Sequence, residues 1–274
     1  GYIILNIMNI KRTPIILFLI IITVWSCNNN KNQNKQSVAE PKNSIIGKWV
    51  RIGQTGPIGF DFKENGLIET DFGNNQMIEV VSKYELSGDT IKFIDKEGKM
   101  CQGTGKYKMY QTEYYLSFDL IDDDCGGRIK ATMGFWTKPN YKDLIKKLSD
   151  DIVKSSNPEL NLNRARVLLA TGMVDKARED FDTYLLSDTL NSRVYVNRAG
   201  TRFPNNLTWV VSDCNKAISL EPSNKNAYFL RGLARYELGE KEQACEDFSK
   251  AIELGFSVLR VAEQEICFDY WKKE

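Results

Sequence analysis

The sequence contains no histidine among its 274 residues. Histidine is the commonest general base and metal ligand, so its absence removes Ser–His and Cys–His catalytic pairs and most zinc sites. None of the six cysteines forms a CxxC pair, which disfavours zinc and thioredoxin-type chemistry. Carboxylates and lysines could still catalyse, so an enzyme ranks third among the candidate functions. We assign no catalytic, cofactor or metal residue.

The sequence also lacks an excess of charge of either sign. It has 37 Lys and Arg against 36 Asp and Glu, a net charge of +1. Two of the basic residues, Lys11 and Arg12, lie in the N-terminal leader, so the remainder is close to neutral. Proteins that bind nucleic acid need a strong positive footprint. The composition therefore argues against a nucleic-acid partner.

Residues 1–26 have the organisation of a signal peptide. Lys11 and Arg12 precede an apolar run over residues 15–25. This run fits the ~7–15 residues of a signal h-region and is shorter than the roughly 20 residues that span a membrane. Met8 is the expected start. The leader predicts export from the cytoplasm.

The leader ends in Val24-Trp25-Ser26-Cys27, which resembles the lipobox of bacterial lipoproteins. The resemblance implies that Cys27 is lipidated and becomes the mature N-terminus, with the membrane as a partner. The alternative is an ordinary secretory signal with an incidental cysteine. Residues 27–43 are too polar to bury a core and predict a flexible tether. Because Asn28 follows the cysteine and no acidic run does, we expect the periplasmic face of the outer membrane, by analogy with other lipoproteins.

Residues 44–138 predict a β domain. Tyr114, Leu116, Phe118 and Leu120 recur with a period of two, and turn signals recur at short spacing throughout the region. About eight short strands fit between the turns. This pattern is typical of a β-barrel or a β-sandwich.

The first expected strand carries Gly47-Lys48-Trp49, which resembles the Gly-x-Trp opening of lipocalin-like barrels. The domain is similar to the small lipocalin-like domains of Bacteroidetes lipoproteins. The resemblance implies that Trp49 packs in the closed end and that the barrel could carry or sense a small apolar ligand. Small eight-stranded barrels can instead be filled by their own side chains.

Two features near the end of this domain invite specific interpretations. Cys101 and Cys125 lie 24 residues apart, and a disulfide closing that loop would stabilise the fold by about 3 kcal/mol. The alternative is two buried thiols. Asp122, Asp123 and Asp124 lack the ligand spacing of a calcium loop, so we interpret them as a solvated turn.

An internal repeat follows a connecting helix expected at residues 139–157. Arg164, Arg198 and Arg231 are spaced 34 and 33 residues apart. A second set of equivalent positions carries Asp180, Asp213 and Asp247. A period of 34 residues that comprises two helices is typical of the tetratricopeptide repeat.

Residues 158–256 resemble tetratricopeptide repeats, most closely in the third unit. There Gly232 and Ala244 should let the two helices approach, while Tyr228 and Phe248 fill the gap between them. Residues 257–274 predict a capping helix. The expected fold class is therefore α+β multidomain: a small antiparallel lipocalin-like β-barrel, then an all-α solenoid of about three repeats with a cap. Similar Bacteroidetes repeat proteins imply a Cys245–Cys267 disulfide, with Cys214 a buried free thiol.

The repeats predict a groove for a protein or peptide partner. Asn163 and Asn197 resemble the asparagines that hold a ligand backbone in peptide-binding tetratricopeptide domains; alternatively they are ordinary surface residues. Leu162 and Val196 stand where such domains have the lysines that clamp an acidic C-terminus, so that ligand is not expected. The predicted groove residues are Asn163, Arg166, Asn197, Phe229, Leu233 and Tyr236. If the cap or the barrel covers this stripe, it is core instead. The leading prediction is a membrane-anchored scaffold, and the alternative is the carrier or sensor named above.

Overall fold

A computed structural model describes residues 45–53, 56–73, 78–95, 101–256 and 267. The predicted signal peptide, Cys27, the tether and the capping helix lie outside these residues, apart from Cys267. Within the described part of the chain, no helix is long and apolar enough to cross a membrane. The chain divides into two compact units, with the boundary between Ser187 and Asp188. Each unit is described by itself.

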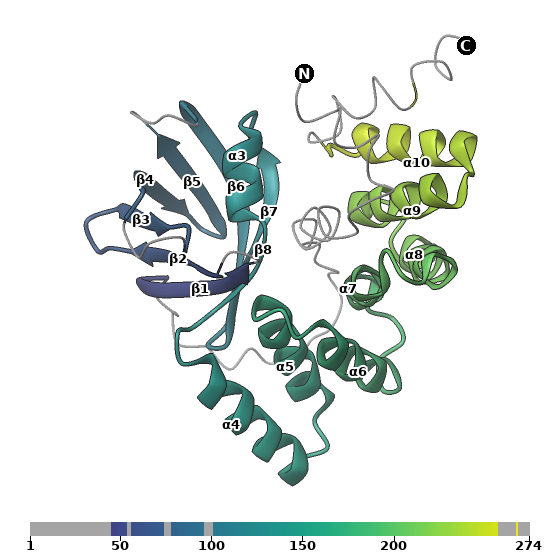
Figure 1. The fold of residues 1–274 in the computed structure, drawn as a ribbon, viewed down its shortest axis with the longest axis horizontal. Helices are drawn as coiled ribbons and strands as arrows, with labels where there is room; N and C mark the ends of the chain where they lie inside the picture. Colours follow the sequence, from purple (N-terminus) through teal and green to yellow (C-terminus); the bar gives the residue numbers. More distant parts are fainter. Residues whose placement is uncertain (1–44, 54–55, 74–77, 96–100, 257–266, 268–274) are drawn as a thin grey trace. The chain divides into compact units, whose positions relative to one another are not determined.

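Eight antiparallel strands form a closed barrel in the first unit, as Figure 1 shows. Each strand pairs with the next along the chain, and β8 returns to β1 through the pair Val50 and Thr137. The strands are β1 (Gly47–Gly53), β2 (Gly56–Phe62), β3 (Leu67–Asp71), β4 (Val80–Ser87), β5 (Thr90–Asp95), β6 (Gly103–Gln111), β7 (Tyr115–Asp122) and β8 (Gly134–Thr137). The expected small antiparallel barrel is confirmed.

Aromatic side chains fill the centre of the barrel. Trp49 and Phe62 are fully buried, and Phe60 stacks on Trp136 with ring centroids 4.0 Å apart. The indole Nε1 of Trp49 donates to the carbonyl of Ile45 at 2.8 Å, which satisfies the buried polar atom. Trp49 is thus a core residue.

Strand β7 departs from the expected alternation, because six consecutive residues from Tyr115 are buried. A strand that is buried on both faces must be covered outside the barrel as well. Helix α5 (Pro158–Ala170) provides the cover, since it contacts β8, β7 and β1.

A short helix interrupts the region that the sequence predicted as β throughout. Helix α3 (Gly126–Thr132) begins after Cys125, whose sulfur accepts from the backbone N–H of Arg128 at 3.4 Å. At the other end, the Arg51 guanidinium donates to the carbonyls of Lys130 and Met133. A cation at a helix C-terminus is favourable because the exposed carbonyls carry partial negative charge. The uniform β prediction was therefore wrong at α3.

Three helices complete the first unit: α4 (Tyr141–Lys154), α5 and α6 (Val174–Leu185). Helix α4 corresponds to the predicted connecting helix. Asn157 caps α5 by accepting from the backbone N–H of Glu159 at 3.1 Å, and Pro158 takes the first helical position, where no N–H is needed. Helices α5 and α6 pack as the first repeat.

The second unit holds two further helix pairs: α7 (Ser192–Arg202) with α8 (Leu207–Leu220), and α9 (Lys225–Leu238) with α10 (Lys241–Glu253). A Cβ atom on Gly232 would lie 2.6 Å from the Phe248 ring and 3.2 Å from the Ala244 carbonyl. This close approach confirms why a glycine stands there. Gly239, with φ 86°, ends α9 in the left-handed conformation.

Candidate functional site

The repeated arginines and aspartates pair within each repeat. In the third repeat, Arg231 donates through Nε and Nη2 to both carboxylate oxygens of Asp247, at 2.9 and 2.6 Å. The same two-bonded pair joins Arg198 to Asp213 and Arg164 to Asp180. Each pair joins the first helix of a repeat to the second. The pairs therefore explain the sequence period as a structural feature.

A second arginine reinforces the pair in two of the three repeats. Arg235 donates to Asp247 at 2.9 Å, and Arg202 donates to Asp213 at 2.7 Å. The first repeat has Leu168 at the matching position, and Asp180 instead accepts from the Asn161 amide at 3.3 Å. The first repeat thus holds its aspartate with one cation rather than two.

The predicted groove stripe of the first repeat packs against the barrel. Leu162 and Leu169 are each 2% exposed on α5. The Arg166 guanidinium lies 4.7 Å from the Tyr115 ring and donates to the Tyr115 hydroxyl at 2.8 Å. Asn163 is half-buried. The barrel therefore covers this part of the stripe, which is the alternative that the sequence left open.

The second unit divides the other predicted groove residues between core and surface. Phe229 stacks on Phe256 with centroids 4.5 Å apart and is buried, so its predicted place at the centre of a binding patch gives way to a core role. Leu233 and Tyr236 are half-buried on α9. Asn197 is 5% exposed on α7. Asn197, Leu233 and Tyr236 therefore remain as candidates.

The structure joins both predicted cysteine pairs as disulfides. The Cα atoms of Cys101 and Cys125 lie 5.9 Å apart, and those of Cys245 and Cys267 lie 5.6 Å apart. Cys214 is a free, buried thiol, as expected. Burial, followed by the nearby Asp213 carboxylate, raises the pKa of Cys214 well above its usual value. Since the thiolate is the reactive form, Cys214 is an inert core residue.

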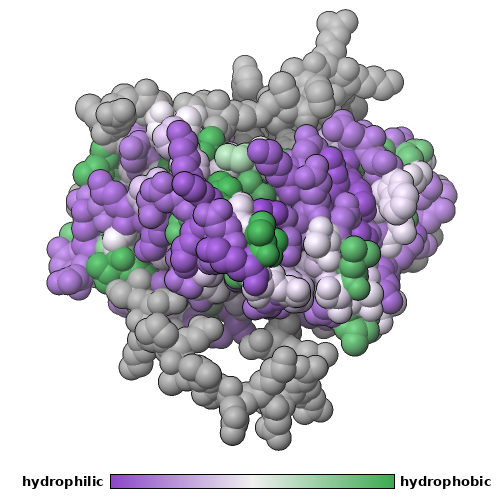
Figure 2. Space-filling view, turned by 90° about the horizontal axis from the view of Figure 1, so that it is seen from below, coloured by the Kyte–Doolittle hydropathy of each residue, from purple (hydrophilic) through white to green (hydrophobic). Residues whose placement is uncertain are grey.

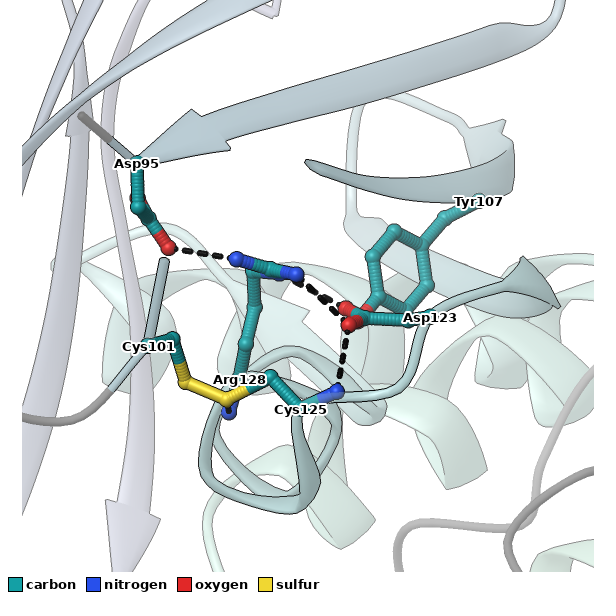
Figure 3. The surroundings of a disulfide bond; sticks show 6 residues. All are labelled: Asp95, Cys101, Tyr107, Asp123, Cys125 and Arg128. Atoms are coloured by element: carbon teal, nitrogen blue, oxygen red, sulfur yellow. Dashed lines mark hydrogen bonds and ion pairs between the residues drawn. A yellow bond between two sulfur atoms is a disulfide. The ribbon is translucent and has the colours of Figure 1, made fainter. Parts of the chain in front are cut away.

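A buried ionic cluster lies beside the Cys101–Cys125 disulfide, as Figure 3 shows. Arg128 donates to both oxygens of Asp123, at 2.7 and 2.6 Å, and to Asp95 at 2.7 Å. Asp123 also accepts from the Tyr107 hydroxyl and from the backbone N–H of Cys125. Asp123 is 5% exposed, so its predicted place in a solvated turn was wrong. The carboxylate instead closes a network around Arg128.

The pKa values of the cluster follow from these contacts. Burial alone would lower the pKa of Arg128, but its hydrogen bonds to Asp123 and Asp95 outweigh that effect and raise it. Burial raises the pKa of Tyr107, and the hydrogen bond to Asp123 raises it further. Arg128 therefore keeps its charge and Tyr107 its proton at neutral pH.

A cavity of about 530 Å³ opens beside this cluster, within the first unit. Its wall combines apolar side chains of β2 to β5 with one side of α3. Asp95 and Arg128 line it, and within the described part of the chain the buried Oδ1 atom of Asp95 has no hydrogen-bond partner. The sequence did not predict the cavity or the buried Asp95, since Asp95 occurs at the end of an ordinary strand. Across the described residues, no group of three His, Cys, Asp or Glu side chains could hold a metal ion.

The face that Figure 2 shows has no broad apolar patch among its coloured residues. Hydrophilic residues predominate there, and the hydrophobic ones form small separate patches. Broad exposed apolar patches usually mark interaction sites, whereas scattered apolar residues are normal. The coloured part of this face therefore gives no apolar docking site.

Comparison with known proteins identifies a repeat family in the second unit. The tetratricopeptide repeat family matches residues 226–254, which comprise most of α9 and α10. RNA polymerase II-associated protein 3 of Rattus norvegicus is 37% identical over 84 residues, which is 30% of this chain and 13% of the relative. The protein of the same name from Mus musculus is 36% identical over 84 residues, again 13% of its length. The chain thus spans a small part of these relatives.

Solved structures also resemble part of the chain. The first repeat domain of Spaghetti (RPAP3), bound to the HSP90 peptide SRMEEVD, is 25% identical with a TM-score of 0.40, covering 42% of this chain and 94% of that one. MamA is 22% identical with a TM-score of 0.46, covering 56% of this chain and 86% of MamA. The chain therefore combines a closed eight-stranded barrel with helices of the tetratricopeptide type.

Proposed function

We propose that helices α7 and α9 form a docking surface for an extended, peptide-like segment of a partner protein. The observation that carries the proposal is that Asn197 on α7 and the half-buried Leu233 and Tyr236 on α9 come from two helices that contact each other. An asparagine amide suits a peptide backbone, because it can donate to a carbonyl and accept from an N–H at once.

Two apolar side chains would flank this amide. Leu233 and Tyr236 lie three residues apart on α9, so they share one face of the helix, and both are half-buried. Helices α7 and α9 contact each other within the second unit. Aromatic and aliphatic anchors supply most of the free energy in such patches, and the amide sets the register. Repeat arrays commonly bind extended segments in this way.

The expected charge of the bound segment follows from the absence of lysines at two positions of the first helices of the repeats. The HSP90 peptide bound to Spaghetti (RPAP3), SRMEEVD, is acidic at its end. In this chain Leu162 and Val196, which are 2% and 3% exposed, stand where lysines would clamp such a terminus. An uncharged internal segment suits this surface better. Because the barrel covers the stripe on α5, including Arg166, the proposed surface is restricted to the second and third repeats.

Site-specific photocrosslinking in the native membrane tests the surface directly. A photoreactive residue replaces Tyr236 in one variant and the exposed Gln243 of α10 in another. We expect one discrete crosslinked partner from position 236 and none from position 243. Adding Asn197→Ala should reduce the yield about five-fold, the scale of one lost hydrogen bond. Asn163→Ala tests the half-buried equivalent in the first repeat.

The matched control is Asn205→Ala, which alters an exposed asparagine in the turn between α7 and α8. It should leave both the crosslink and the thermal melt unchanged. Equal crosslinking from positions 236 and 243 would contradict the proposal. So would an Asn197→Ala variant that melts normally and crosslinks at the full yield.

We also propose that this binding module is held at the outer membrane, on the periplasmic face, by lipid on Cys27. The support is the sequence: a short apolar leader, the lipobox-like Val24-Trp25-Ser26-Cys27 and a polar tether. Several acyl chains anchor stably, whereas one chain is marginal. Cys27→Ala should move the protein to the soluble fraction. A variant that is processed normally and stays in the membrane would contradict lipid attachment.

A further inference from the structure

We propose that the barrel cavity binds a small amphipathic cation, with an apolar body among the barrel aromatics and a protonated amine against Asp95. The inference concerns the first unit and is independent of the docking surface on α7 and α9. It rests on three features of the cavity: its apolar wall, one unpaired carboxylate oxygen and the charge count around that oxygen.

The wall favours an apolar ligand body. Phe60, Ile68, Phe72 and Phe93 line the cavity, and Ala131 of α3 adds a small side chain. A volume of about 530 Å³ falls within the range of small-molecule sites, roughly 300–1,000 Å³. Apolar cavities of this kind gain affinity from each methylene group that leaves water. The wall by itself does not select a head group.

Asp95 supplies that selection. Its Oδ2 accepts from Arg128 at 2.7 Å, whereas its Oδ1 is buried and has no partner among the residues that the structure describes. Leaving a buried acceptor unpaired is costly, and an ionised carboxylate can only accept. The missing partner is therefore a donor, and the cavity is the space from which a donor can reach Asp95.

The charge count favours a cation over a neutral donor. Arg128 is the cation that lines the cavity, and it already serves both Asp123 and Asp95, so this cluster keeps one net negative charge. Glu79 also lines the cavity and adds a second negative charge. Arg51 is not among the lining residues and donates instead to carbonyls at the end of α3. A protonated amine balances the excess, whereas a carboxylate ligand would meet like charge.

Calorimetric titration of the whole protein with three eight-carbon probes tests the choice of head group. We expect n-octylammonium to bind at least ten-fold more tightly than octanoate, with n-octanol in between. Across butyl-, hexyl- and octylammonium, affinity should rise about three- to four-fold per methylene, the gain expected for burial in an apolar site. Raised salt should weaken the ammonium and leave the alcohol unaffected.

Two variants locate the binding. Asp95→Asn should weaken octylammonium at least ten-fold and leave octanol within two-fold. Asp89→Asn is the matched control, since Asp89 is 61% exposed and pairs with Lys108 outside the cavity, and it should change nothing. Ala131→Phe should fill the cavity and abolish binding of all three probes. If Asp95→Asn fails to fold, Ala131→Phe still tests whether the probes bind in the cavity. The preference for a head group is then measured on the unaltered protein.

Three results would overturn the proposal. The first is no saturable binding of octylammonium up to about 10 mM, a concentration that reveals even millimolar affinity. The second is octanoate binding as tightly as octylammonium. The third is full binding by a folded Ala131→Phe variant, which would place the probe outside the cavity.

Discussion

The first and third repeats carry the same structural motif in different surroundings. On α5, which packs against the barrel, Leu162, Arg166 and Leu169 are buried, and Arg166 contacts Tyr115 of β7. On α9, the matching positions are Phe229, Leu233 and Tyr236, of which Phe229 is buried and the other two are half-buried. The same stripe of a repeat is thus an internal interface in one case and partly surface in the other.

The difference separates what a repeat determines locally from what its neighbours decide. The arginine–aspartate pair forms in every repeat, because both partners lie within one helix pair. Whether the stripe on the first helix is buried or exposed depends on which element packs against it. A repeat motif therefore predicts its internal packing well and its binding surface poorly.

The largest effect should come from removing the aspartate that two arginines share. Asp247→Ala leaves Arg231 and Arg235 without that carboxylate in a largely buried site. Breaking a buried ion pair from one side is strongly destabilising, and partial exposure of these arginines lowers the cost to about 3 kcal/mol. Asp180→Ala, which affects only Arg164 among the arginines, should cost about 2 kcal/mol. Denaturant unfolding measures both.

The control for this comparison is Asp175→Ala. Asp175 is 83% exposed and pairs with Arg178, so the loss should stay within about 0.5 kcal/mol. If Asp180→Ala costs as much as Asp247→Ala, the second arginine contributes nothing and the distinction between the repeats fails.

A smaller difference in unfolding free energy should separate substitutions in the buried stripe on α5 from those in the half-buried stripe on α9. Arg166→Ala removes the hydrogen bond and the cation–π contact to Tyr115 and should cost about 2 kcal/mol. Tyr115→Phe removes only the hydrogen bond and should cost about 1 kcal/mol. Leu233→Ala, at the matching position of the third repeat, should also cost about 1 kcal/mol because it is only half-buried.

These three variants are compared by unfolding free energy on the whole chain. The ordering is the test: Arg166→Ala should exceed Leu233→Ala by more than the error of the measurement. A larger loss from Leu233→Ala would mean that the α9 stripe is core, which would also remove the basis of the docking surface.

Residues that act within a short stretch of chain were predictable. The alternation around Phe118 indicated a strand, and the glycine at 232 indicated a close helix contact, which the Phe248 ring confirms. The period of the arginines and aspartates was visible, although their pairing was not foreseen. Local spacing carries this information because it follows from helix and strand geometry.

Features that depend on distant elements were not predictable. Helix α3 begins with two glycines, which are poor helix formers, and it forms where Cys125 is joined to Cys101 and Arg128 reaches Asp95. An aspartate after a strand looks the same whether it meets water or a buried arginine. An aromatic on a helix likewise looks the same whether it meets Phe256 or a partner.

Stability at alkaline pH also distinguishes the two units, through an effect that is absent at neutral pH. Cys214 in the second unit and Tyr107 in the first both have pKa values raised by burial. A raised pKa means that the folded state holds a proton that the unfolded state loses, so stability is fully present below the unfolded pKa and falls as pH rises above it. The Cys214 contribution should begin to fall above pH 9 and the Tyr107 contribution above pH 10.

The two contributions can be separated by unfolding the protein at a series of pH values from 8 to about 11, where each group changes stability by at most about 1.4 kcal/mol per pH unit. Cys214→Ala should remove the loss between pH 9 and 10 and keep the loss above pH 10. Tyr107→Phe should keep the loss between pH 9 and 10 and reduce the loss above pH 10, because it deletes the ionising hydroxyl. Part of that loss should remain, since burial also raises the pKa values of Tyr84 and Tyr114. If Cys214→Ala follows the unaltered protein throughout, Cys214 ionises in the folded state, and the second unit is looser around α8 than its packing indicates.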